Sequence, residues 1–115
     1  IGNTGVGKTQ LINQFVKQQF NEQSQQTIGV SCVTKSVVYE NKHRKVCMWD
    51  TAGQEKFRSI TQQYFMGTHV CVLVFDLQNQ QSLTDCDFWV KSFRNVMIKA
   101  PIVLVGNKCD NAPLV

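Results

Sequence analysis

The stretch GNTGVGKT, residues 2–9, decides the fold. It fits the pattern G-x-x-x-x-G-K-S/T, in which successive backbone N–H groups point into one concavity that suits a chain of phosphates. A helix that begins at Gly7 adds its positive N-terminal end, Lys8 supplies a cation for the β- and γ-phosphates, and the hydroxyl of Thr9 can bind Mg²⁺. The stretch therefore predicts a nucleoside triphosphate site, but it identifies neither the base nor the reaction.

Two further motifs narrow the chemistry. WDTAGQE, residues 49–55, places Asp50 at the end of a strand, where its carboxylate can hold Mg²⁺ through water, and it offers the N–H of Gly53 to a γ-phosphate. NKCD, residues 107–110, follows a short apolar strand. The carboxylate of Asp110 can accept hydrogen bonds from two adjacent donors of guanine, which adenine does not offer in that arrangement. The three motifs together predict a guanine nucleotide.

Composition bounds the class of protein. The chain has 115 residues, 43% of them apolar, and a net charge of +4, which fits one globular domain. Its basic residues are scattered, so nucleic acid is not an expected partner. The five cysteines form no C-x-x-C pair, which argues against a zinc site or a redox motif and favours reduced thiols. No apolar run is long enough to span a membrane.

The hydrophobic pattern alternates between strands and helices. Helical spacing of apolar residues recurs in three stretches, residues 9–20, 53–67 and 82–98. Two β-rich runs, residues 31–40 and 43–50, flank Asn41 and Lys42 and predict an antiparallel hairpin. The wholly apolar runs at 70–76 and 101–107 predict parallel strands covered on both faces. Because only Ile1 precedes the glycine loop, we expect a segment that lacks its first strand and its last strand and helix.

These residues resemble the Ras-like small GTPases, and most closely the Rab family. The resemblance covers the whole chain and rests on GVGKT, TIGV, WDTAGQEKFRSI and NKCD, which follow the family's order and spacing. It implies an α/β, P-loop NTPase fold with a mostly parallel sheet, one antiparallel edge strand and helices on both faces. Residues 1–115 would form a partial G domain, incomplete at both ends. The implied function is a switch that binds GTP, hydrolyses it to GDP and regulates vesicle trafficking.

The resemblance also implies roles for individual residues. Thr27, in TIGV, matches the threonine that binds Mg²⁺ and senses the γ-phosphate, and Gln54 matches the glutamine that orients the attacking water. Lys8 joins these two as a catalytic residue, and the Mg²⁺ ligands would be Thr9, Thr27 and Asp50. The implied nucleotide-binding residues are Asn3, Thr4, Gly5, Val6, Gly7, Lys8, Thr9, Gln10, Phe20, Thr27, Gly53, Asn107, Lys108 and Asp110.

Three of these assignments carry a specific expectation. Phe20 matches an aromatic residue that packs on guanine, although a core position at the end of a helix remains an alternative. Asn107 is expected to brace the loop, and Lys108 to lay its stem along the base.

Protein partners are expected at the regions around Thr27 and Gln54, where effectors, exchange factors and GTPase-activating proteins would bind. Trp49 and Phe65 match surface aromatics that the family uses for effectors, whereas Cys32 replaces another of them. The expected location is the cytoplasm, with cycling to the cytoplasmic face of intracellular membranes. Membrane attachment would come only through a C-terminal lipid anchor that is not present in this chain.

Two other functions stay open. A nucleotide-binding interaction module with little hydrolysis is favoured by Thr4 in the glycine loop and by IGVSC, where Rab proteins usually read IGVDF. A P-loop ATPase or small-molecule kinase would share the glycine loop, but the NKCD motif counts against it.

Overall fold

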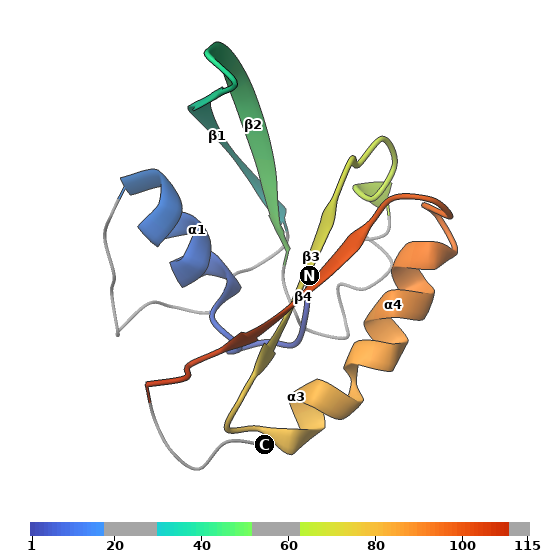
Figure 1. Cartoon of the computed structure of the whole chain (residues 1–115). Coiled ribbons are helices and arrows are strands. Elements are labelled where there is room, and N and C mark those ends of the chain that lie inside the picture. Colours follow the sequence, from blue (N-terminus) through green and yellow to red (C-terminus); the bar gives the residue numbers. More distant parts are fainter. Residues whose placement is uncertain (18–29, 52–62, 111–115) are drawn as a thin grey trace.

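Figure 1 shows a computed structural model of the chain, which describes residues 1–17, 30–51 and 63–110. In chain order the elements are α1 (Lys8–Lys17), β1 (Val30–Tyr39), β2 (Lys42–Thr51), β3 (Cys71–Asp76), α3 (Gln80–Thr84), α4 (Cys86–Arg94) and β4 (Ile102–Asn107). The expected alternation of helices and strands is present in these residues. Most of the helix expected at 53–67 lies outside them, and its end is a turn at Gly67, where φ is +76°.

The predicted hairpin is confirmed. β1 and β2 pair antiparallel from Val30 opposite Thr51 to Tyr39 opposite Lys42. The turn consists of Glu40 and Asn41, one residue earlier than predicted, and their φ angles are 50° and 60°. Positive φ at both central residues is typical of the tight turn that matches the twist of a hairpin, and asparagine tolerates it well.

The second sheet brings the ends of several segments to one edge. β3 and β4 pair parallel, with Asp76 opposite Asn107 at their carboxyl ends. Ile1 extends this pattern along the other edge of β3, because its amino group donates to the carbonyl of Val72 at 2.8 Å and its carbonyl accepts from the N–H of Val74 at 2.9 Å. The glycine loop therefore starts at the carboxyl edge of the parallel sheet, where ligands of α/β proteins bind.

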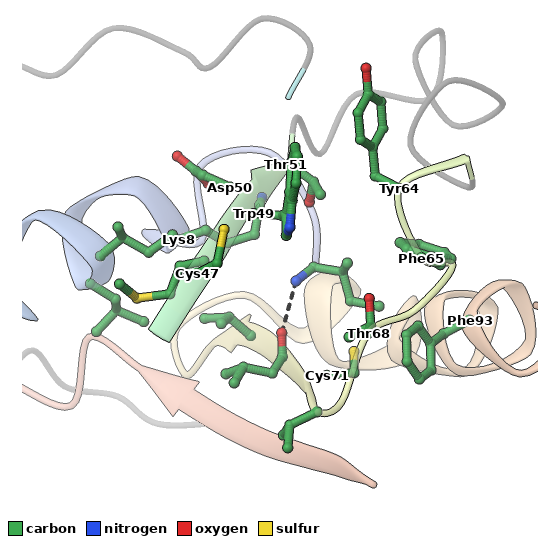
Figure 2. A pocket seen from close by; sticks show the side chains of 17 residues that line it. Lys8, Cys47, Trp49, Asp50, Thr51, Tyr64, Phe65, Thr68, Cys71 and Phe93 are labelled. Atoms are coloured by element: carbon green, nitrogen blue, oxygen red, sulfur yellow. Dashed lines mark hydrogen bonds between the residues drawn. The ribbon is translucent and has the colours of Figure 1, made fainter. Parts of the chain in front are cut away.

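The expected mostly parallel sheet is observed only in part. The described residues form two separate two-stranded sheets, β1–β2 and β3–β4. A pocket of about 260 Å³ lies between β2, β3 and α1, and Figure 2 shows its lining. Within the described parts of the chain, no strand lies between β2 and β3 to join their hydrogen-bonding edges.

The core lies between β3 and α4. Trp89 and Phe93 are each 1% exposed and pack with Leu73 and Cys71 of β3, and burial of such aromatic side chains stabilises the fold by about 1.5 to 3 kcal/mol each. Figure 1 shows α1 and α4 on opposite sides of the β3–β4 sheet. None of the described helices is long and apolar enough to cross a membrane.

Two predictions about this region were partly wrong. The single helix expected over residues 82–98 is two helices, which meet at Asp85, where ψ is −10°. The expected cover on both faces is incomplete in the described residues, since Val103 and Leu104 of β4 are 50% and 54% exposed. Because these two residues are adjacent in the strand, they point to opposite faces, and the cover is incomplete on both faces of β4.

Candidate nucleotide-binding site

The glycine loop is shaped by close contacts with its neighbours. Gly7 has a φ of +100°, and a Cβ there would lie 2.3 Å from Nδ2 of Asn107. A Cβ on Gly2 would lie 2.1 Å from the carbonyl oxygen of Val74. Both positions therefore need glycine, whereas a Cβ on Gly5 would meet no atom within 4 Å. The loop is packed against the sheet on one side and open on the other.

Lys8 folds back across this loop. Its Nζ donates to the carbonyl oxygens of Gly2 at 2.9 Å and Asn3 at 2.8 Å. Burial lowers the pKa of Lys8 to about 8, against the opposing effect of the Asp50 carboxylate. An anion bound in the loop would raise this pKa again, because a negative charge nearby favours the charged ammonium. The side chain is thus placed to pair with a phosphate.

Thr9 and Asp50 meet beside the loop. Oγ1 of Thr9 donates to Oδ2 of Asp50 at 2.6 Å, and Asp50 is only 4% exposed. Its other carboxylate oxygen, Oδ1, accepts no hydrogen bond from any residue that the structure describes. A buried carboxylate oxygen without a donor is costly, and Mg²⁺ with its retained waters would satisfy it. These two residues fit the expected metal site.

The NKCD motif contacts the same loop. Nδ2 of Asn107 donates to the carbonyl of Val6 at 2.8 Å and so braces the glycine loop. Nζ of Lys108 donates to the carbonyl of Gly5 at 2.8 Å and also forms an ion pair with Asp76 at 2.7 Å. Lys108 therefore joins the glycine loop to the end of β3.

Asp76 helps to hold Lys108 in place beside the glycine loop, and the sequence did not predict this role. Burial raises the pKa of this carboxyl, but hydrogen bonds from Lys108 and from the N–H of Gln78 outweigh burial and lower the pKa overall. The only sequence signal was its place at the end of an apolar strand. Asp110, by contrast, lies in an exposed turn after Lys108, where its carboxylate is open to a ligand.

The side chain of Asn3 turns away from the loop. Its Nδ2 donates to Oδ2 of Asp85 at 2.6 Å, and its Oδ1 accepts from the indole Nε1 of Trp89 at 2.7 Å. The amide is thus engaged by the helices α3 and α4, so Asn3 can serve a phosphate only through its backbone. Helical spacing placed Trp89 in the core, but nothing in the sequence pointed to this hydrogen bond.

The remaining expected residues divide into two groups. Thr4 is exposed in the loop, Val6 is buried beneath it, and Gln10 is half-buried on α1. Four others lie outside the described residues, namely Phe20, Thr27, Gly53 and Gln54. The structure therefore brings together Lys8, Thr9, Asp50 and the NKCD residues beside the glycine loop. The expected roles of Phe20, Thr27, Gly53 and Gln54 stay predictions.

One expectation about the surface was wrong. Phe65 is only 4% exposed and packs edge-on against Phe93, with ring centroids 5.3 Å apart. Its neighbour Tyr64 is exposed and lies 5.4 Å from the ring of Trp49 (Figure 2). Adjacent residues in this turn face opposite ways, so the exposed aromatic pair is Trp49 and Tyr64.

The pocket between β2 and β3 has a different chemistry from the glycine loop. Lys8 and Asp50 are among the residues that line it (Figure 2). Most of its lining is apolar, from residues such as Ile1, Leu11 and Met48. A triphosphate needs donors and cations, which the glycine loop supplies. The loop is therefore the candidate nucleotide site.

Comparison with known proteins identifies the family of the chain. A sequence profile of the Ras family matches residues 1–113. The chain is 41% identical over 111 residues to the GTP-binding protein ypt3 of Schizosaccharomyces pombe, with 96% of this chain and 52% of ypt3 aligned. It is 42% identical over 111 residues to the Ras-related protein RABA4d of Arabidopsis thaliana, with 96% and 50% aligned.

A third relative is the Ras-related protein Rab-22A of Homo sapiens, 36% identical over 115 residues, with 96% of this chain and 57% of the relative aligned. The chain spans about half the length of the curated relatives it matches. The profile match and these identities agree with the glycine loop, the Thr9–Asp50 contact and the bracing NKCD motif, so the chain belongs to the Ras family.

Proposed function

We propose that this protein is a Rab-type molecular switch that binds GTP and GDP with Mg²⁺ and hydrolyses GTP. The observation that carries the proposal is the meeting of three separate motifs at one edge of the sheet. Asn107 and Lys108 bind carbonyls of the glycine loop, and Thr9 at the start of α1 binds Asp50 at the end of β2. The description of the S. pombe relative as a GTP-binding protein supports the choice of nucleotide.

Each part of the nucleotide would have its own contacts. The backbone of the glycine loop and Nζ of Lys8 would hold the phosphates, and Thr9 and Asp50 would hold the metal. When bound, Mg²⁺ neutralises charge on the β- and γ-phosphates. The exposed carboxylate of Asp110 would accept both adjacent donors of guanine. Lys108 would serve the site by fixing the loop, because its ammonium is already bound to Gly5 and Asp76.

Hydrolysis and partner selection are proposed from the family resemblance. Gln54 would orient the attacking water, and Thr27 would respond to the γ-phosphate and the metal. Loss of the γ-phosphate would release both regions, which is how such proteins exchange partners. The exposed pair of Trp49 and Tyr64 would belong to the effector surface, and the Rab names of the relatives support a role in vesicle trafficking on intracellular membranes.

We also propose that residues 1–115 form part of a G domain whose sheet is mostly parallel, with helices on both faces. Its support is the parallel β3–β4 pair, the parallel bonding of Ile1 to β3, and the antiparallel hairpin that β1 forms with β2. The apolar pocket between β2 and β3 has the position that a further strand of such a sheet would take.

The proposed function is tested by a substitution that should change which base the protein prefers. Asp110→Asn replaces a carboxylate by an amide, which can donate to the carbonyl that xanthine carries in place of the amine of guanine. Competition binding with GTP, ATP and xanthosine triphosphate should show guanine preference in the unmodified protein and a shift towards xanthosine triphosphate in the variant. Sites built around such hydrogen bonds can discriminate by roughly 10⁴-fold.

Asp87→Asn is the matched control. Asp87 is an exposed carboxylate on α4 that pairs only with Lys91 among the described residues, so its loss should leave the base preference unchanged. An Asp110→Asn protein that kept its preference for GTP would refute the assignment of Asp110.

A further inference from the structure

The hairpin brings two cysteines together that are far apart in the sequence. Cys32 lies on β1 opposite Trp49, and Cys47 lies on β2 opposite Thr34. The two cysteines are therefore diagonal neighbours on one face of the hairpin, a spacing at which cross-strand side chains still reach each other. Their Sγ atoms lie 2.7 Å apart, and both residues are exposed.

This separation is close to a covalent one. A disulfide bond is about 2.05 Å long, so the two sulfur atoms need to approach only slightly further for a bond to form. Nothing in the sequence pointed to this pair, because the cysteines lie fifteen positions apart in the chain and only the register of the hairpin makes them neighbours.

The other thiols have different surroundings. Cys71 and Cys86 are buried, and burial raises the pKa of both thiols, which keeps them protonated and unreactive. Cys109 is exposed at the edge of the nucleotide site. It provides an internal example of an accessible thiol that lies outside the hairpin.

We propose that Cys32 and Cys47 are a redox-active pair that closes to an intramolecular disulfide by exchange with a low-molecular-weight disulfide such as oxidised glutathione. One cysteine, as its thiolate, attacks a sulfur of the oxidant, forms a mixed disulfide and releases one glutathione thiolate. The second thiolate then attacks the cysteine sulfur of that mixed disulfide and releases the other glutathione. The two thiol protons go to the two leaving thiolates, so two protein thiols are oxidised and one disulfide is reduced.

Proximity, not acidity, favours the reaction. A hydrogen bond with Cys47 raises the pKa of the Cys32 thiol, so this group is not an activated thiolate at neutral pH. The advantage lies in the second step, because the resolving sulfur is already held next to the mixed disulfide and needs no encounter in solution. The two cysteines are diagonal neighbours and both are exposed, and strained or exposed disulfides are easily reduced again.

The proposed disulfide would affect the surface around Trp49. It would tie β1 to β2 at the position of Trp49, whose ring is 48% exposed and forms the aromatic pair with Tyr64. Oxidation would therefore alter the surface beside this aromatic pair without touching the glycine loop. The proposal rests on the hairpin alone and does not depend on the proposed nucleotide chemistry.

The test is a redox titration of the protein in glutathione buffers, followed by alkylation, tryptic digestion without reduction and mass spectrometry. Cleavage after lysine separates Cys32, in residues 18–35, from Cys47, in residues 46–56. The expected product is these two peptides joined, lighter by two hydrogen atoms than their sum. Recovery of each peptide carrying its own glutathione, with no joined product, would overturn the proposal.

A dilution series sharpens this result. When total glutathione is lowered tenfold at a constant ratio of reduced to oxidised forms, an intramolecular disulfide gains about tenfold in its oxidised-to-reduced ratio, because it releases two glutathiones. A mixed disulfide, as expected at Cys109, does not change. If the oxidised fraction at Cys32 and Cys47 failed to respond to dilution, the pair would not form the bond.

Serine variants identify the partners. Cys32→Ser and Cys47→Ser should each abolish the joined peptide, and the remaining thiol should then carry glutathione as Cys109 does. Cys109→Ser is the matched control, because it removes an exposed thiol outside the hairpin and should leave the joined peptide unchanged. Equal thermal transitions of the three variants would show that folding is retained, and a joined product that survived either hairpin substitution would contradict the assignment.

Discussion

The indole of Trp89 donates a hydrogen bond of 2.7 Å to the side-chain oxygen of Asn3, and so joins the core helix α4 to the glycine loop. The amide of the same Asn3 donates to Asp85, where α3 and α4 meet. The first turn of the loop is thereby fixed by residues more than 80 positions away in the chain. The loop owes its position to the core as well as to its glycines.

We expect this link to stabilise the protein measurably. Trp89→Phe keeps a buried aromatic ring but removes the N–H donor and part of the indole. Leaving the oxygen of Asn3 without its donor should lower the free energy of unfolding by about 1 to 3 kcal/mol, and the smaller ring should add a cavity cost. Urea denaturation measures the change. A double-mutant cycle with Asn3→Ala should give a coupling of at least about 0.5 kcal/mol, whereas strictly additive effects would mean that the contact contributes nothing.

The ion pair between Asp76 and Lys108 should make stability depend on pH. The hydrogen bonds to Asp76 lower its pKa in the folded state, so its contribution is present above the ordinary aspartate value of about 3.9 and is lost as pH falls through the folded pKa. The difference in unfolding free energy between the unmodified protein and Asp76→Asn should therefore be constant above about pH 5 and shrink in more acidic solution.

Denaturation series at several pH values would check this dependence. Asp87→Asn again serves as the control, because its exposed pair with Lys91 should contribute little at any pH. A difference between the unmodified protein and Asp76→Asn that grew on acidification would show that burial, not Lys108, dominates the Asp76 carboxyl.

Thr9→Asn should weaken binding of GTP more than binding of GDP. Thr9 and Asp50 would hold the metal, which would neutralise charge on the phosphates, so the loss of Thr9 should cost more when the γ-phosphate is present. Affinities for both nucleotides, measured with and without Mg²⁺, give the ratio. If the ratio were the same in the variant and the unmodified protein, Thr9 would not be a ligand of the metal.

Gln54→Leu should slow the intrinsic hydrolysis of GTP and leave nucleotide affinity nearly intact. A side chain that only orients water acts in the transition state and contributes little to the ground state. Single-turnover hydrolysis beside equilibrium binding separates the two effects. An unchanged rate would favour the alternative function, a nucleotide-binding interaction module with little hydrolysis.

The sequence alone predicted the order of the elements and the family to which the chain belongs. The glycine loop, the strand that ends at Asp50 and the strand before Asn107 are each contiguous in the chain, and their character follows from local pattern. The backbone conformation of a contiguous motif can be predicted from its own residues. Glycine positions and the spacing of apolar residues determine the local conformation over only a few residues. For this reason the hairpin and the parallel strands were predictable, whereas the roles of the site residues stay predictions and Asp76 was not among them.

Only the tertiary structure decided which side chains meet. Asn107 reaches Val6 and Cys32 reaches Cys47 because parallel and antiparallel registers set their positions, and a register is fixed by packing over whole strands. Packing also turned Phe65 into the core and left Tyr64 outside, although both are aromatic and adjacent. Contacts between distant residues depend on how the elements pack, and no local pattern in the chain encodes that arrangement.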